Sequence, residues 1–208
     1  MNQQRAPTGI ILAAGQSSRF GADKLLHELT IANKRQLLIQ HTLQLWCSVF
    51  DELCIVIRPD NLLLKEAIIS WSDQQHEKIN LIEAEQAMSG MGHSLKAAIS
   101  ATAGAGGWVI GLADMPLIPH AVLRQICESL QQGAGITAPY YDDQRGHPVG
   151  FNSVYKDELM ALEGDTGAKN LLQREVDKIH KILTIERGVL ADVDSIDDVT
   201  VIERLGRV

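Results

Sequence analysis

The chain has few aromatic side chains and an excess of acidic ones. Phenylalanine, tryptophan and tyrosine make up 4% of the 208 residues, and the formal net charge at pH 7 is −7. Proteins that bind single-stranded nucleic acid stack bases on aromatic rings, and proteins that follow a phosphate backbone need a basic surface. The composition therefore argues against a nucleic-acid partner, and it restricts any phosphate site to a local basic pocket.

Cysteines and long apolar runs are also scarce. The three cysteines, Cys47, Cys54 and Cys127, form no C-x-x-C pair, which argues against a disulfide framework or a cysteine-based zinc site. They are typical of buried thiols in a reducing compartment, so we expect a cytoplasmic protein. No apolar run is long enough to span a membrane, and residues 10–14 after Arg5 are too short for the core of a secretory signal.

Short apolar runs alternate with amphipathic stretches along most of the chain, which is 45% hydrophobic and fits one domain, residues 1–208. This alternation predicts an α/β fold with a mostly parallel sheet and right-handed crossovers. Asp60 is the expected cap of the helix that follows the second strand. Strands are expected at residues 10–14, 53–57, 79–82, 108–113 and 182–185, with a hairpin or extended excursion formed by residues 136–141 and 147–151.

A glycine-rich loop follows the first predicted strand, residues 10–14. It contains Gly15 and Gly21 together with two cations, Arg19 and Lys24. Glycine lets backbone N–H groups approach an anion closely, and the cations add positive charge. Because ligands of open α/β sheets bind beyond the carboxyl ends of the strands, the sequence predicts a phosphate-binding loop here.

Two common phosphate-binding motifs do not fit this loop. A Walker loop requires Gly-Lys-Ser/Thr in direct succession, whereas Lys24 comes three residues after Gly21 and precedes Leu25. The G-x-G-x-x-G spacing of dinucleotide-binding domains does not occur in this loop, which argues against a redox domain that uses a nicotinamide cofactor.

Residues 12–24 instead resemble the Leu-Ala-Ala-Gly-x-Ser-x-Arg-x-Gly-x-x-Lys signature of nucleotidyltransferases that activate small molecules with an NTP, although Phe20 replaces the usual methionine. With Ala14 in place of a second glycine, the segment is most similar to the molybdenum cofactor cytidylyltransferases of the MobA-like NTP transferase superfamily. The resemblance implies a three-layer Rossmann-like fold with helices on both faces of the sheet. It also implies that the nucleotide is bound by Leu12, Ala13, Ala14, Gly15, Ser17, Arg19 and Lys24.

Asp114 follows a predicted buried strand in the segment Leu-Ala-Asp-Met-Pro. Its carboxylate is expected at the same edge of the sheet as Lys24, where it would bind a magnesium ion that bridges NTP phosphates. The alternative is a simple turn-forming residue before Pro116. The segment resembles the metal-binding Gly/Ala-Asp-Met-Pro motif of the family, which favours the metal site.

Asp192 and Asp194 offer a second carboxylate to the same ion. The alternation of side chains along an extended segment places both on one side of the chain. The alternative is that Asp194 or Ser195 caps the C-terminal helix. The family motif Asp-x-Asp-Thr-Pro-Glu-Asp favours Asp194 as the ligand, but Ser195 and Ile196 replace Thr-Pro here, and the choice between the two aspartates stays open.

Three further segments resemble family motifs. Residues 89–94 resemble the loop that receives the nucleobase, although Ser94 is equally explained as a helix cap. Residues 146–151 resemble the Gly-His-Pro-Val segment beside the acceptor, and residues 164–169 resemble a segment that commonly ends in arginine. The resemblance assigns nucleotide contacts to Gly90, Gly92 and Ser94, and acceptor contacts to His147, Pro148, Asp165 and Lys169.

The implied reaction is the Mg²⁺-dependent transfer of CMP from CTP to a phosphorylated pterin, the molybdopterin-type cofactor, with release of pyrophosphate. Such a transfer needs no enzyme nucleophile, because catalysis consists of positioning and charge neutralisation. Arg19, Lys24 and Asp114 are the implied catalytic residues, and Asp114 and Asp194 the implied metal ligands. Alternatives are GTP as donor, a sugar or polyol phosphate as acceptor, and a non-catalytic chaperone that contacts a molybdoenzyme.

Overall fold

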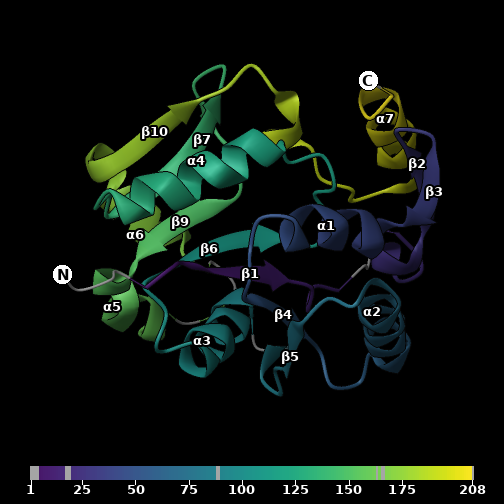
Figure 1. Cartoon of the computed structure of the whole chain (residues 1–208), viewed down its shortest axis with the longest axis horizontal. Coiled ribbons are helices and arrows are strands. Elements are labelled where there is room, and N and C mark those ends of the chain that lie inside the picture. The colour runs from purple at the N-terminus through teal and green to yellow at the C-terminus, as the bar shows by residue number, and fades with distance from the viewer. Residues whose placement is uncertain (1–4, 17–19, 88–89, 163, 165–166, 208) are drawn as a thin grey trace.

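The computed structural model describes residues 5–16, 20–87, 90–162, 164 and 167–207. Within these residues a mixed central sheet is covered by helices on both faces, and a small antiparallel sheet stands beside it (Figure 1). This is the predicted α/β architecture. No helix in the described part of the chain is long and apolar enough to cross a membrane.

The central sheet has the strand order β10-β7-β9-β6-β1-β4-β5, and the short strand β8 pairs with β7. Neighbouring strands are parallel, except that β9 runs antiparallel to β6 and to β7 and β8 runs antiparallel to β7. The predicted antiparallel excursion is therefore inserted into the middle of the sheet. The strands are β1 (Thr8–Leu12), β4 (Leu53–Ile57), β5 (Ile79–Glu83), β6 (Gly107–Leu112), β7 (Ile136–Tyr141), β8 (Gln144–Arg145), β9 (Val149–Asn152) and β10 (Ile179–Leu183).

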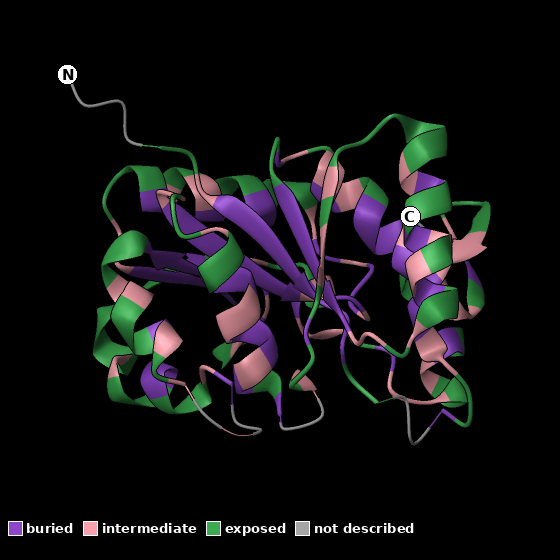
Figure 2. Cartoon of the chain, turned by 90° about the horizontal axis from the view of Figure 1, so that it is seen from below, coloured by how far each residue is buried: buried purple, intermediate pink, exposed green. Residues whose placement is uncertain are grey.

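Two apolar cores lie on the two faces of this sheet, which explains why its inner strands are apolar throughout. Ile11 of β1 packs into one core and Ile10 into the other, and both are fully buried. Figure 2 shows the buried strands between helices whose outer surfaces are exposed. The first core is covered by α1 (Leu38–Cys47), α2 (Leu62–Gln75), α4 (His120–Gln131) and α7 (Ile196–Leu205), and the second by α3 (Met91–Ala101), α5 (Lys156–Met160) and α6 (Lys169–Arg174).

The small sheet is an antiparallel hairpin of β2 (Glu28–Ile31) and β3 (Lys34–Leu37). Its turn residues Ala32 and Asn33 both have positive φ angles, of 48° and 62°, as a two-residue hairpin turn of this hand requires. The C-terminal helix α7 packs beside it, and the Ala32 N–H donates to the Gly206 carbonyl at 2.8 Å. Helix α1 begins at Leu38 because the preceding residues form β3.

Three local predictions were wrong. The first strand is Thr8–Leu12 rather than residues 10–14, because its pairing with β4 and β6 ends at Leu12. Asp60 does not cap α2, because Asn61 is the N-cap and its side chain accepts from the Leu64 N–H at 3.2 Å, whereas Asp60 pairs with Arg58. The last strand is Ile179–Leu183 rather than residues 182–185, because its pairing with β7 begins at Ile179.

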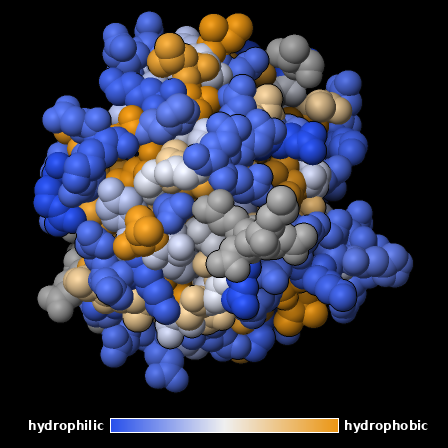
Figure 3. All heavy atoms as spheres, turned by 60° about the vertical axis from the view of Figure 1, so that its left-hand side comes forward, coloured by the Kyte–Doolittle hydropathy of each residue, from blue (hydrophilic) through white to orange (hydrophobic). Residues whose placement is uncertain are grey.

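The face of the molecule that carries β10 is largely hydrophilic, with apolar side chains scattered among polar ones (Figure 3). Leu183 of β10 is 80% exposed and Ile185 is 92% exposed. Isolated apolar side chains of this kind are normal on a protein surface and need no partner to explain them.

Candidate functional site

The loop after β1 and the segment that contains Asp114 begin at the same edge of the sheet. β1 and β6 are parallel neighbours in register, with Leu12 opposite Leu112. The chain then continues in parallel on both strands, and the Ala113 N–H donates to the Leu12 carbonyl at 3.1 Å. The carboxyl ends of these two strands therefore present their following residues to a common rim, as the sequence predicted.

Lys24 is held at this rim by a short 3₁₀ helix, Lys24–Leu26. Asp23 caps that helix by accepting from the Leu25 N–H at 3.0 Å, and its second carboxylate oxygen accepts from the Asn61 side chain at 2.6 Å. Since Asn61 also caps α2, the backbone at Lys24 is tied to the start of a long helix.

The Lys24 ammonium lies between two carboxylates. Its Nζ is 2.6 Å from Asp114 Oδ2 and 2.9 Å from Asp194 Oδ1, and the lysine side chain is 13% exposed. Burial alone would lower the pKa of Lys24, but attraction and hydrogen bonding to Asp114, and then to Asp194, outweigh it and raise the pKa above its ordinary value. The ammonium is therefore charged at neutral pH.

Asp192 joins Asp114 and Asp194 in a cluster whose carboxylate oxygens lie within 4.8 Å of one another. The Val193 N–H donates to the Asp114 carbonyl at 3.0 Å, and Val193 is fully buried, so both flanking aspartates are directed to the rim. Partial burial raises the pKa of Asp192, and the negative charges of Asp114 and Asp194 raise it further.

The cluster offers the kind of ligand atoms that a hard divalent cation binds. Its potential ligands are all carboxylate oxygens, which Mg²⁺ and Mn²⁺ prefer. Asp114 Oδ1 is buried and has no hydrogen-bond partner among the described residues. This oxygen is therefore available as a metal ligand beside the other carboxylates. The residues present thus fit a divalent metal ion.

A neighbouring helix supports the segment before Asp114. The Thr42 hydroxyl, on α1, is fully buried and donates to the Ala113 carbonyl at 2.9 Å. In the segment that carries Asp194, Ser195 is the N-cap of α7, and the Asp194 side chain is directed to Lys24. No sequence pattern pointed to Thr42, whereas the prediction that Ser195 caps the C-terminal helix is confirmed.

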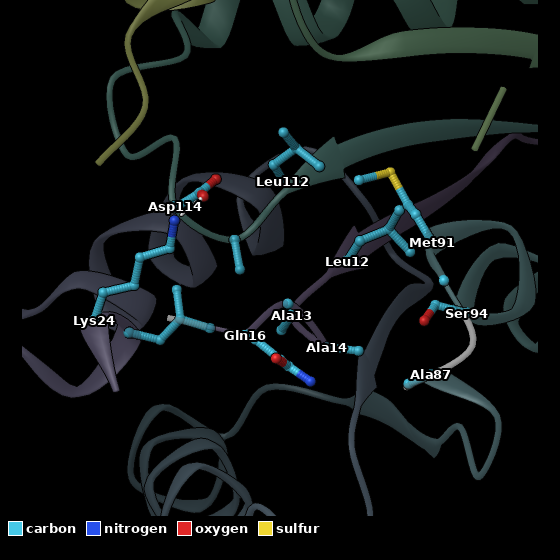
Figure 4. A pocket seen from close by; sticks show the side chains of 14 residues that line it. Leu12, Ala13, Ala14, Gln16, Lys24, Ala87, Met91, Ser94, Leu112 and Asp114 are labelled. Atoms are coloured by element: carbon cyan, nitrogen blue, oxygen red, sulfur yellow. Dashed lines mark hydrogen bonds and ion pairs between the residues drawn. The ribbon is translucent and has the colours of Figure 1, made fainter. Parts of the chain in front are cut away.

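A cavity of about 460 Å³ opens beside Lys24 and Asp114. Figure 4 shows these two residues at one end of the cavity, with Ala87, Met91 and Ser94 at the other end. Seven residues that the sequence assigned to the nucleotide line it: Leu12, Ala13, Ala14, Gly15, Lys24, Gly90 and Ser94. The lining residues that sequence reasoning missed are Gln16, Leu25, Ala87, Met91, Leu112 and Ala113.

Gly90 and Gly92 have different surroundings. Gly90 is the N-cap of α3 and has a φ angle of 119°, which glycine tolerates best, so Ser94 is not the helix cap. Gly92 does not line the cavity, and its N–H donates to the Gly164 carbonyl at 3.0 Å. Ser94 lies inside α3 and is 3% exposed.

A larger groove, of about 1110 Å³, lies at the amino ends of the strands near Thr8, Leu53 and Ile79. Ligands of open α/β sheets bind at the carboxyl ends instead. The smaller cavity also adjoins the charged cluster, and we therefore take it as the functional site.

The residues predicted to contact the acceptor are more widely spread. His147 and Pro148 precede β9, outside the cavity lining, and the His147 N–H donates to the Val189 carbonyl at 2.9 Å. Burial, together with the positive charge of Arg145, lowers the pKa of His147 to about 4 against the attraction of Asp192. His147 is therefore neutral at neutral pH.

Lys169 is exposed at the start of α6. The neighbouring Gly167 lies close to the cavity, because a Cβ added to it would be 3.0 Å from the Met91 sulfur. Ser17, Arg19 and Asp165, which the sequence also assigned to the site, lie outside the described residues.

Solved structures with this fold include the crystal structure of Rv0371c from Mycobacterium tuberculosis H37Rv, with 26% identity and a TM-score of 0.77 over 96% of this chain and 98% of that one. A complex of Rv0371c with manganese gives 24% identity and a TM-score of 0.72 over the same shares of the two chains. Molybdopterin-guanine dinucleotide biosynthesis protein A from Archaeoglobus fulgidus gives 16% identity and a TM-score of 0.64, over 95% of this chain and 97% of that one.

A search of curated protein sequences found no match. The family model of the MobA-like NTP transferase domain matches residues 9–179, which include β1 from Gly9 onward, Lys24, Asp114 and the lining of the cavity. The chain belongs to the MobA-like NTP transferase domain family and is a nucleotidyltransferase.

Proposed function

We propose that the enzyme transfers CMP from CTP to a molybdopterin-type cofactor and releases pyrophosphate, with Mg²⁺ as the metal. The observation that carries the proposal is the Lys24 ammonium, held between Asp114 and Asp194 at one end of a cavity lined by the loop after β1. This arrangement offers both positive charge for a triphosphate and carboxylate oxygens for its divalent ion. Since CTP is a cytoplasmic metabolite, we expect a cytoplasmic enzyme.

The described residues would bind the nucleotide along the length of the cavity. Lys24 would neutralise the phosphates at its charged end, together with Arg19 from the same loop. Ser94 lines the opposite end, where the base would lie (Figure 4), and Gly90 lines the same cavity. Ala14 lines the cavity where guanylyltransferases more often carry glycine, and this supports CTP over GTP.

Asp114 and Asp194 would hold the metal, with Asp192 within reach of the same position. The bound ion would neutralise negative charge on the triphosphate and on the departing pyrophosphate. The manganese complex of Rv0371c supports a divalent ion in this fold. Magnesium is the expected ion because it binds nucleotide phosphates with only one or two protein carboxylates.

The transfer itself requires no nucleophile from the protein. A phosphate oxygen of the acceptor forms a bond to the α-phosphorus, the bond from that phosphorus to the bridging oxygen breaks, and pyrophosphate leaves with the electron pair. The protein holds the two reactants in line and stabilises the charge. His147, Pro148, Asp165 and Lys169 would hold the acceptor, and its product would pass to a molybdoenzyme through a transient contact.

The experiment is a matrix of pyrophosphate release by the purified enzyme with Mg²⁺. Each of CTP, GTP, ATP and UTP is tested without acceptor, with molybdopterin-type cofactor and with sugar or polyol phosphates. We expect release with CTP and the pterin cofactor, and mass spectrometry should detect the cytosine dinucleotide. Release only with GTP or only with a sugar phosphate would contradict the substrate assignment, and CTP binding without any release would contradict catalysis.

A further inference from the structure

Asp198, on the first turn of α7, makes more hydrogen bonds than a helix cap requires. Its Oδ2 accepts from the Ser195 N–H at 2.7 Å and from the Ser195 hydroxyl at 2.8 Å. The same oxygen accepts from the N–H of Asp194 at 3.0 Å. In a capping box the side chain at the position of Asp198 accepts from the backbone N–H of the N-cap residue, here Ser195, and from no earlier residue. The bond to Asp194 therefore adds a constraint on the residue that contacts Lys24.

The segment with the two rim aspartates is fixed at two points. At one point the Val193 N–H donates to the Asp114 carbonyl, and the Val193 side chain is buried. At the other point Asp198 holds the N–H groups of Asp194 and Ser195. With the backbone held on both sides, the Asp194 carboxylate keeps its position next to Asp114.

We infer that Asp198 is a positioning residue for the metal site, which acts by holding the backbone of Asp194 so that its carboxylate and that of Asp114 address one ion. This rests on the metal site of the proposed function. Groups that hold a metal ligand in place are worth about 10- to 100-fold in metal affinity. Asp198 belongs in this class because its bonds reach the ligand's own backbone.

The test is a titration of the full chain with Mn²⁺, without nucleotide, in which the free ion is measured by electron paramagnetic resonance. We expect Asp198→Ala to weaken Mn²⁺ binding about tenfold. Asp198→Asn keeps an oxygen acceptor and should retain affinity within about threefold of the wild type, an order-of-magnitude expectation for a neutral acceptor. Asp197→Ala is the matched control, because Asp197 is an exposed acidic residue in the same helical turn.

Equal Mn²⁺ affinities for Asp198→Ala and Asp197→Ala would overturn the inference, because only charge near the helix end would then matter. An Asp198→Asn variant as weak as Asp198→Ala would overturn it too. If the wild type itself binds no Mn²⁺, both this inference and the metal site of the proposed function fail. If the wild type binds Mn²⁺ and releases pyrophosphate but Asp198→Ala binds normally, only this inference fails.

A measurement on the wild type covers the case in which Asp198→Ala does not fold. Hydrogen exchange followed by NMR should show the Asp194 and Ser195 amides protected from solvent, since both donate to Asp198. Fast exchange of both amides would overturn the inference independently of any variant.

Discussion

At the scale of single residues, charge pairing around Lys24 dominates the site. Lys24, Asp114 and Asp194 come from distant parts of the chain and meet within hydrogen-bond distance. Each of these groups is mostly withdrawn from water, so their interactions are screened less than those of a surface pair. The sequence predicted the common location of Lys24 and Asp114 because the two strand ends had to share one edge of the sheet, whereas only the family motif implied Asp194.

We expect Lys24→Ala and Asp114→Ala each to lower turnover at least ~100-fold, because Lys24 would neutralise the phosphates and Asp114 would hold the ion that neutralises them. The measurement is steady-state pyrophosphate release with CTP and the pterin acceptor. Lys65→Ala is the control, since Lys65 forms a 2.6 Å ion pair with Glu83 on the surface. Activity like that of the wild type in either site variant would contradict the role given to that residue.

The lowered pKa of His147 predicts that the protein loses stability in acid. Its pKa is about 4 in the folded chain against an ordinary value of 6.5, so the unfolded chain takes up the proton first. Its contribution to folding is fully present above pH 6.5 and is lost as the pH falls toward 4. We expect a loss of about 1–2 kcal/mol between pH 7.5 and pH 5 from this group.

The measurement is urea unfolding at both pH values for the wild type and for His147→Gln. The variant should lose less stability in acid than the wild type does. The exposed His180, replaced by glutamine, is the control and should leave the difference unchanged. Equal pH dependence in the wild type and His147→Gln would refute the assignment.

At the scale of elements, the apolar runs predicted the inner strands well because those strands are buried on both faces. The position of β9 between β6 and β7 could not be predicted from the sequence, because strand order depends on long-range packing rather than on local pattern. The β2–β3 hairpin was not among the strands predicted from the sequence. Ala32 and Asn33 are not the usual residue pair for such a turn, and the contact with α7 supplies the missing support.

The assignment of Asn61 as the N-cap of α2 can be tested directly. Asn61→Ala removes the bonds to Leu64 and to Asp23, and we expect it to lower the free energy of unfolding by about 1 kcal/mol. Asp60→Ala is the matched control, because the Asp60 side chain is 72% exposed and forms a surface ion pair with Arg58. Urea unfolding that shows equal effects of the two substitutions would show that Asn61 is not the cap.

At the scale of the whole molecule, the sheet brings the segments that carry Lys24 and Asp114 together, and helices support these segments and the one that carries Asp194. α1 supports Asp114 through Thr42, the start of α2 supports Lys24 through Asn61 and Asp23, and α7 supports Asp194. The sequence identified the residues that carry charge. It did not identify these supporting contacts, because side-chain bonds between distant elements leave no local pattern.

Close packing of α1 on the sheet predicts that Gly111 accepts no side chain. A Cβ at this position would lie 2.3 Å from Cζ2 of Trp46, so we expect Gly111→Ala to cost about 1–3 kcal/mol of stability. Replacing Trp46 with leucine in the same chain should recover part of that loss relative to the two single variants. Additive effects of the two substitutions in urea unfolding would contradict this packing.

The most direct test of the account is a crystal structure with CTP and Mg²⁺. We predict that the triphosphate lies at the end of the cavity near Lys24, with the ion about 2.1 Å from a carboxylate oxygen of Asp114. A nucleotide bound instead in the groove at the amino ends of the strands, or an ion held without Asp114 and Asp194, would contradict it.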